Sequence, residues 1–248
     1  MATPRVLLVT STKEPYQPVR LTYRVPNSAF VRKRLRVLDC VGEDAETGRL
    51  SVWLHGETLA LPFGKPPSEF VAGGRKVILG IFRFPDAKRM TLDVRSIPRA
   101  IELARLLRPR MGPEVVLERV RVVNRLFEAK EGRDLDVLDK CLDRDVTVIR
   151  PEEIEREQRA YVDEGRTQEE RRARFFEWHE RRRGHDVPVV EDYPTAPEEE
   201  TETFRDLAMG LELRALRCLR RWNGESVTLR KLIEETVANS NMPVGHQP

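Results

Sequence analysis

Basic and aromatic side chains gather at three places in the first hundred residues. The set comprises Arg32, Lys33, Arg34, Arg36, Trp53, Phe82, Arg83, Phe84, Lys88 and Arg89. Cations of this kind neutralise phosphates, and aromatic rings offer faces on which bases stack. These residue types therefore predict a surface that binds a single-stranded nucleic acid. Two alternatives stay open: the cations form an ordinary solvated surface, and Phe82 and Phe84 fill the protein core.

A second arginine-rich segment, residues 166–185, surrounds Phe175, Phe176 and Trp178. From 151 to 184, nine arginines stand beside ten carboxylates, so the segment is close to neutral. The pairs Glu170 with Arg174 and Glu177 with Arg181 have the four-residue spacing of ion pairs on one helix face. Phe175 and Trp178, three residues apart, form an apolar stripe. This pattern predicts a charged helix that docks in part on the protein or a partner; a nucleic-acid contact is the alternative.

Catalytic and metal-binding patterns are weak. His179 and Glu180 could begin an H-E-x-x-H zinc motif, but Arg183 stands at the position of the second histidine. Asp136, Asp139 and Asp143 share one side of an expected helix and could hold a divalent metal as in a nuclease, but an amphipathic helix with an acidic outer face explains every one of these residues and is favoured. Phosphate-binding glycine loops, serine elbows and Cys-His pairs are missing from the sequence. We therefore expect no enzyme activity, cofactor or metal.

Charge is distributed unevenly along the 248 residues. Residues 1–125 contain 23 Lys and Arg against 12 Asp and Glu, a net charge of +11, whereas the remaining residues carry −8. A basic half attracts a polyanion. The acidic half, whose helices carry apolar stripes, is expected to bind a protein partner or a second copy.

Three features of the sequence indicate the cellular compartment of the protein. The sequence lacks an apolar run of the roughly 18 residues that span a bilayer, and its first residues do not resemble a signal peptide. Cys40, Cys141 and Cys218 are odd in number and widely spaced, which favours buried thiols over disulfides. A cytoplasmic protein is expected.

Strand patterns fill the first hundred residues. Residues 34–56 contain two extended runs joined by a polar loop with Gly48, and residues 75–96 repeat this hairpin with Pro85 and Asp86 in the turn. Shorter runs at 5–10, 19–25 and 58–64 could add strands. Several short strands in this length predict a small closed barrel, because closure removes exposed edges.

Helical patterns follow. We expect helices over 98–109, over 114–127 with Val116, Val120, Val123 and Phe127 on one face, and over 134–143. Prolines and carboxylates without a period indicate a linker over 185–202. Apolar residues from Phe204 to Trp222 and from Leu229 to Thr236 then predict a helical pair, which Gly224 separates.

The first strands resemble an oligonucleotide-binding (OB) fold domain. The resemblance covers about residues 30 to 97 and lies in the hairpin at 34–56, the glycine-marked strand "GGRKVILGIFRF" and the closing strand "KRMTLDVRSI". It implies a small barrel that binds nucleic acid. The stretch "ALRCLRRWNGESVTLRKLIEETV" resembles the first two helices of a winged helix.

The sequence thus predicts an α+β protein in five parts. These are a basic barrel at 1–97, a helical extension at 98–150, a charged helical segment at 151–184, a linker at 185–202 and a helical pair with a tail at 203–248. The expected function is binding of single-stranded DNA or RNA with little sequence preference, as a subunit of a larger complex. The alternative is a protein-binding adaptor without nucleic-acid contact. Expected partner contacts are Phe175, Trp178, Phe204, Leu211 and Trp222.

Overall fold

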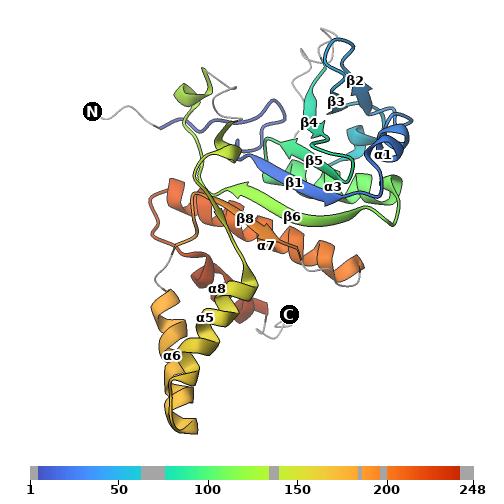
Figure 1. The fold of residues 1–248 in the computed structure, drawn as a ribbon. Coiled ribbons are helices and arrows are strands. Elements are labelled where there is room, and N and C mark those ends of the chain that lie inside the picture. The colour runs from blue at the N-terminus through green and yellow to red at the C-terminus, as the bar shows by residue number, and fades with distance from the viewer. Residues whose placement is uncertain (1–4, 63–75, 134–139, 184–185, 196–199, 241–248) are drawn as a thin grey trace, which may run out of the picture.

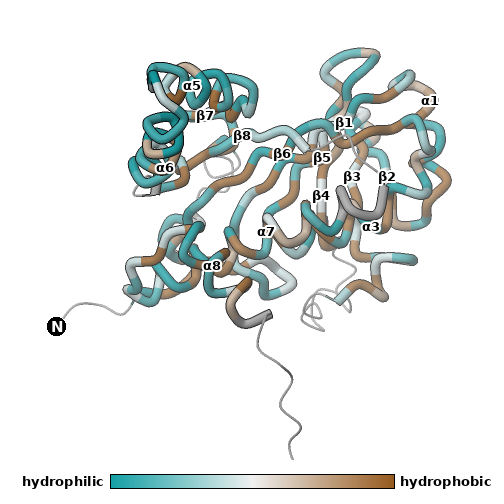
Figure 2. Tube along the Cα trace, turned by 90° about the horizontal axis from the view of Figure 1, so that it is seen from below, coloured by the Kyte–Doolittle hydropathy of each residue, from teal (hydrophilic) through white to brown (hydrophobic). Residues whose placement is uncertain are grey.

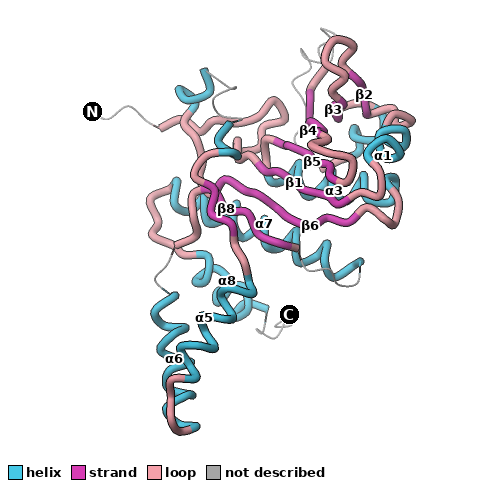
Figure 3. The backbone as a smooth tube through the Cα atoms, viewed as in Figure 1, coloured by secondary structure: helices cyan, strands magenta, loops and turns pink. Residues whose placement is uncertain are grey.

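A computed structural model describes residues 5–62, 76–133, 140–183, 186–195 and 200–240. Helices are interspersed with strands along the chain (Figure 3). The strands are β1 (Val19–Arg24), β2 (Val41–Glu43), β3 (Leu50–Trp53), β4 (Ile78–Arg83), β5 (Arg89–Val94), β6 (Val116–Val123), β7 (Val146–Val148) and β8 (Val190–Pro194). The α-helices are α1 (Ser28–Leu35), α3 (Ile97–Met111), α5 (Pro151–Asp163), α6 (Gln168–Arg183), α7 (Glu200–Trp222) and α8 (Leu229–Ser240). Short 3-10 helices are η1 (Gly56–Ala60), η2 (Ala129–Arg133) and η3 (Lys140–Asp143).

All eight named strands belong to one open sheet with the order β2-β3-β4-β5-β1-β6-β8-β7 (Figure 1). Neighbouring strands are antiparallel except β7 and β8, which are parallel. The predicted closed barrel is therefore wrong. β1 pairs with β5 on one side and with β6 on the other, so the sheet continues toward β8 and β7 instead of closing on itself.

Both predicted hairpins are present. β2 and β3 pair across a polar loop in which Gly48 has a φ of 63°, a left-handed conformation that glycine adopts without strain. β4 and β5 pair across the turn that contains Pro85 and Asp86. The first hairpin is shorter than expected: its first two residues belong to α1, which Asn27 caps through the Ala29 amide, and β2 begins only at Val41. Residues 58–60, expected to continue the strands, belong to η1.

The helix predicted over 114–127 is strand β6. Val120 and Val122 are fully buried in the core, while Arg119 and Arg121 lie on the opposite face. This two-residue alternation and the β-branched valines suit a strand between β1 and β8. The extension expected over 98–150 therefore contains two strands, β6 and β7, beside the correctly predicted helix α3.

The main core lies between the sheet and helices α3 and α7 (Figures 1 and 2). Val19, Leu21 and Tyr23 of β1 point toward these helices and are buried. Pro98 stands at the start of α3, and Ser96 accepts a hydrogen bond from the Arg99 amide there. Fully buried Leu211 of α7 lies in the same core. Helix α7 is thus part of the fold that forms around the sheet.

Helices α5 and α6 form a hairpin that extends away from the sheet, beyond the β7 edge (Figures 1 and 2). The two helices pack on each other, and α5 contains no buried residue. Glu177 pairs with Arg181 as predicted, at 2.5 Å. Arg174 instead reaches Glu164 at 2.7 Å, because Glu170 accepts hydrogen bonds from the amides that begin α6.

The segment expected as a linker, 185–202, contains strand β8, which lies inside the sheet between β6 and β7. Beyond it, α7 and α8 form the predicted helical pair, separated near Gly224 with its φ of 91°. Within the described part of the chain, none of the helices combines the length and the apolar character needed to cross a membrane.

Candidate nucleic-acid interface

One face of the sheet, opposite α3 and α7, is rich in arginine, and we call it the arginine face. Along β1, Arg20, Thr22 and Arg24 point to this face, since they alternate with the buried residues Val19, Leu21 and Tyr23. Strand pairing places Arg20 between Asp93 of β5 and Arg121 of β6. Thr22 lies in the same way between Thr91 and Arg119.

Four neighbouring strands, β4, β5, β1 and β6, contribute arginines to this face. They are Arg20, Arg24, Arg83, Arg89, Arg119 and Arg121. The side chains of Arg24, Arg83 and Arg89 are between 58% and 62% exposed, and each contacts one carboxylate, of Glu118, Asp93 and Asp86 respectively. Ion pairs at such exposed positions contribute little stability, because water screens them. These three cations can therefore exchange a carboxylate for another anion at low cost.

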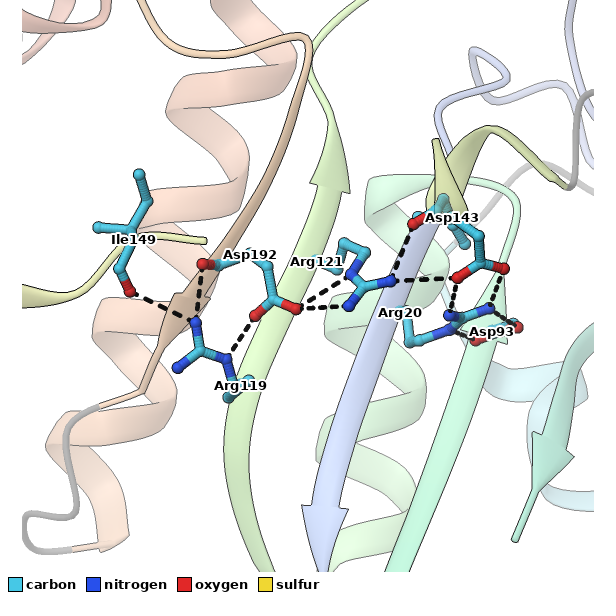
Figure 4. A network of polar contacts seen from close by, with 8 residues as sticks. Arg20, Asp93, Arg119, Arg121, Asp143, Ile149 and Asp192 are labelled. Carbon is cyan, nitrogen blue, oxygen red and sulfur yellow. Dashed lines mark hydrogen bonds and ion pairs between the residues drawn. The ribbon is translucent and has the colours of Figure 1, made fainter. Parts of the chain in front are cut away.

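The remaining arginines form a continuous network with three aspartates (Figure 4). Arg20 donates to Asp93 at 2.6 Å and 2.9 Å, and Arg121 donates to Asp192 of β8 at 2.8 Å and 3.0 Å. Arg119 holds the other oxygen of Asp192 at 2.5 Å and also donates to the Ile149 carbonyl. Arg20 thus binds both oxygens of Asp93 in a bidentate pair, and the other two guanidiniums are each held by more than one hydrogen bond.

Asp143 of η3 joins the two halves of the network. It accepts from Arg20 Nη1 at 2.6 Å and from Arg121 Nη1 at 3.1 Å. Partial burial alone would raise the pKa of the Asp143 carboxyl, but the hydrogen bond and charge of Arg20, with the charge of Arg121, lower the pKa below its ordinary value. Burial lowers the pKa of Arg20, and the hydrogen bonds to Asp93 and Asp143 more than reverse this effect. Both groups are charged at neutral pH.

The basic group on α1 lies outside the arginine face. Arg32 and Arg36 share the Glu43 carboxylate, and Arg34 donates to the Arg110 carbonyl at the end of α3. Lys33 is exposed. The Arg32 guanidinium also lies 4.6 Å from the ring centre of Phe84, which packs partly against the core. The predicted cluster is therefore divided: Arg83 and Arg89 belong to the arginine face and the α1 cations do not.

Two of the predicted stacking residues are covered. Phe82 is 2% exposed and lies in the core, as the alternative interpretation of the sequence had it. Its ring is therefore not accessible to a base. Trp53 is half-buried, and its indole lies directly over Gly42, where any Cβ would fall 2.0 Å from the ring. The Lys76 ammonium is 3.6 Å from the centre of the same indole. A base can stack on Trp53 only where Lys76 gives way.

The turn between β4 and β5 holds the remaining predicted cation. Lys88 is exposed and donates to the Pro26 carbonyl at 2.6 Å, while the amide of Ser28 donates to the Ala87 carbonyl. These contacts attach the turn to the start of α1. Lys88 thus links the β4–β5 turn to the segment before α1, although its side chain is exposed to solvent.

Arg20, Arg24, Arg119 and Arg121 were missed by reasoning from the sequence. Their signal is the alternation in "VRLTYR" and "ERVRVV", which places every arginine on one side of a strand. Because residues 114–127 were predicted to form a helix, Arg119 and Arg121 were not among the predicted nucleic-acid contacts. The partners Asp143 and Asp192 have no local signal, because pairing across the sheet brings them there.

Predicted partner residues differ in their surroundings. Phe175 and Phe176 of α6 are 41% and 55% exposed, with ring centres 5.8 Å apart. Trp178 is half-buried beneath the Arg182 guanidinium. Leu211 is a core residue, so it is unavailable for docking, and Trp222 is half-buried with Arg5 4.1 Å from its ring centre. Phe204 belongs to α7, but its side chain lies outside the described residues.

The candidate metal site is not assembled among the residues that the structure describes, which contain no group of three or more potential metal ligands. Asp143 pairs with arginines, and Asp136 and Asp139 lie outside those residues. His179 contacts Gln158 at 2.9 Å across the α5–α6 hairpin.

Comparison with known proteins gives no match: neither a protein family, nor a curated protein, nor a solved structure is similar to this chain.

Proposed function

We propose that this protein binds single-stranded nucleic acid with little sequence preference across its arginine face. The observation that carries the proposal is the set of six arginines on four adjacent strands of one sheet face. Guanidinium groups bind phosphate oxygens through paired hydrogen bonds. Since these groups contact the nucleic-acid backbone, they position a strand without reading its bases.

The breadth of the face favours a single strand over a duplex. A DNA major groove admits a helix or a two-stranded ribbon, whereas here the arginines are spread over four strands of a wide sheet. A face four β-strands wide is large enough for a single-stranded nucleic acid to lie across it. DNA and RNA strands both satisfy this chemistry, and membership of a larger nucleic-acid complex is part of the same proposal.

Three exposed arginines provide the test. Replacing Arg24, Arg83 and Arg89 with Gln should weaken binding of a labelled single strand and flatten its salt dependence. Each phosphate contact contributes about 0.7 to the slope of log affinity against log salt concentration, so the slope should fall by about 2. Fluorescence anisotropy with single-stranded DNA, single-stranded RNA and duplex at several salt concentrations measures this.

The matched control replaces Arg205, Arg230 and Lys231 of α7 and α8 with Gln, which removes the same charge far from the arginine face. This control should keep the wild-type slope. Equal effects of the two triple variants would mean that only net charge matters, and an absence of binding at low salt would favour the adaptor function.

Protein docking through the α5–α6 hairpin is a second candidate function. The hairpin exposes Phe175 and Phe176 beside each other, and α5 has no buried residue. Helix α5 carries five acidic and two basic residues, while α6 carries six arginines and four glutamates. An antiparallel two-fold arrangement sets α5 of one copy against α6 of the other, so this charge pattern favours a second copy.

Light scattering after size-exclusion chromatography tests the docking. We expect a mass near twice 28.8 kDa for the wild type. The double variant Phe175→Ser with Phe176→Ser should be monomeric with unchanged circular dichroism. Val37→Ser with Leu59→Ser, two other exposed apolar positions, serves as the control and should remain dimeric. A monomeric wild type at every concentration would exclude the second copy.

A further inference from the structure

Three carboxylates contact the two central arginines of the network on the arginine face. Arg20 and Arg121 stand opposite each other on β1 and β6. Each also contacts an aspartate on a neighbouring strand: Arg20 shares Asp93 with Arg83, and Arg121 shares Asp192 with Arg119. Asp143 is a third acid, supplied by η3 from outside these strands, and it lies between the two guanidiniums (Figure 4). The space between the Arg20 and Arg121 guanidiniums, which we call the central position, is therefore occupied by an anionic group, the Asp143 carboxylate.

Exposure separates the three acids. The Asp143 side chain is 55% exposed, whereas Asp93 and Asp192 are largely buried beneath the arginines. Asp143 thus occupies the solvent side of the position, from which a ligand would approach. Leu142 beside it is buried with Tyr16 and Phe127, and its carbonyl accepts from Arg121 at 3.0 Å. These contacts hold the backbone of η3, so the Asp143 carboxylate can leave by rotation of its own side chain.

A hollow in the surface adjoins this position. Ile81, Leu142, Arg83, Arg95 and Asp93 contribute to its lining, so it combines apolar walls with two cations and one carboxylate. A phosphate between Arg20 and Arg121 would have an apolar surface next to it on the β4 side. That arrangement suits a phosphate joined to a sugar and base better than a free inorganic ion.

We propose that Arg20 and Arg121 form a phosphate-binding position and that Asp143 is its internal competitor. The identification of the phosphate with a strand backbone rests on the proposed function. A phosphate offers more acceptor oxygens than a carboxylate and carries the same sign of charge. Asp143 keeps the two arginines oriented while the position has no ligand, and it must turn away when a strand binds.

The variant Asp143→Asn tests the competition, because it removes the charge and keeps the shape. Affinity for a labelled single strand should rise by about threefold to tenfold, the net scale of one ordinary hydrogen bond. Asp145→Asn is the matched control: Asp145 is exposed, two residues away and without an ion pair to the described residues, and asparagine tolerates its φ of 49°. The control should leave the affinity near that of the wild type. Equal gains in the two variants would overturn the proposal.

A second arm uses inorganic phosphate and pyrophosphate, with the thermal unfolding midpoint as the readout. Both ions should raise the midpoint of Asp143→Asn more than that of the wild type, and adding Arg121→Gln should abolish the gain. If phosphate and pyrophosphate act in this way but no single-stranded nucleic acid binds, the phosphate-binding position is supported and the proposed function is refuted. If Asp143→Asn lowers the midpoint and changes neither strand nor phosphate binding, Asp143 is a structural tie and the proposal is wrong.

Discussion

At the scale of single residues, buried charges identify the positions on which the fold depends. Arg99 of α3 is almost fully buried, and its guanidinium donates to Thr12 and to the Ile78 carbonyl, with Glu14 3.5 Å away. Burial lowers the pKa of Arg99 to about 10, while the charge of Glu14 opposes this shift. The pair attaches residues 10–14 to the start of α3.

Removing the acid alone should leave a buried cation without a counter-charge. We expect Glu14→Gln to lower the free energy of unfolding by about 3 kcal/mol, the cost of breaking a buried pair from one side. Glu46→Gln in the exposed β2–β3 loop should change it by less than about 0.5 kcal/mol. Chemical denaturation measures both variants, and similar values for the two would show that Glu14 does not compensate Arg99.

At the scale of elements, local patterns were sufficient where one period dominated. The alternation of Met90, Leu92 and Val94 predicted β5 and its hairpin, and Pro98 with Ala100 and Ile101 predicted α3. For β6 the valines fit both periods, since Val116, Val120 and Val123 also recur at helical spacing. Residues 116–123 form a strand because they pair with β1 on one side and with β8 on the other.

The arginine face shows why sites are harder to predict than elements. Arg119 and Arg121 have a local signal once β6 is known to be a strand. Their partner Asp192 is about seventy residues away, in a segment whose prolines and acids predicted a linker. These groups meet because strands distant in the sequence pair in a particular register, and this register cannot be read from the pattern of any single element. Hydrophobic alternation also gave no means to distinguish a closed barrel from an open sheet.

At the scale of the whole molecule, the basic and acidic halves of the sequence are not two modules. Strand β8 and helix α7 come from the acidic half, yet they complete the sheet and the main core. The hairpin α5–α6 is different, because it is inserted between neighbouring strands β7 and β8 and its helices pack mainly on each other. The molecule therefore consists of one packed body with one projecting hairpin, and this division predicts which part can be removed.

Replacing residues 151–183 by a short bridge of glycine and serine should leave the body folded. We expect its thermal midpoint to change by less than about 4 °C, the effect of roughly 1 kcal/mol in a protein of this size. The shortened chain should bind a single strand with the wild-type salt slope, since the arginine face remains complete, and it should be monomeric. Calorimetry, anisotropy and light scattering check the three results. Loss of cooperative unfolding would show that the hairpin belongs to the core. A folded shortened chain that no longer binds single-stranded nucleic acid would show that α5 and α6 make the nucleic-acid contacts.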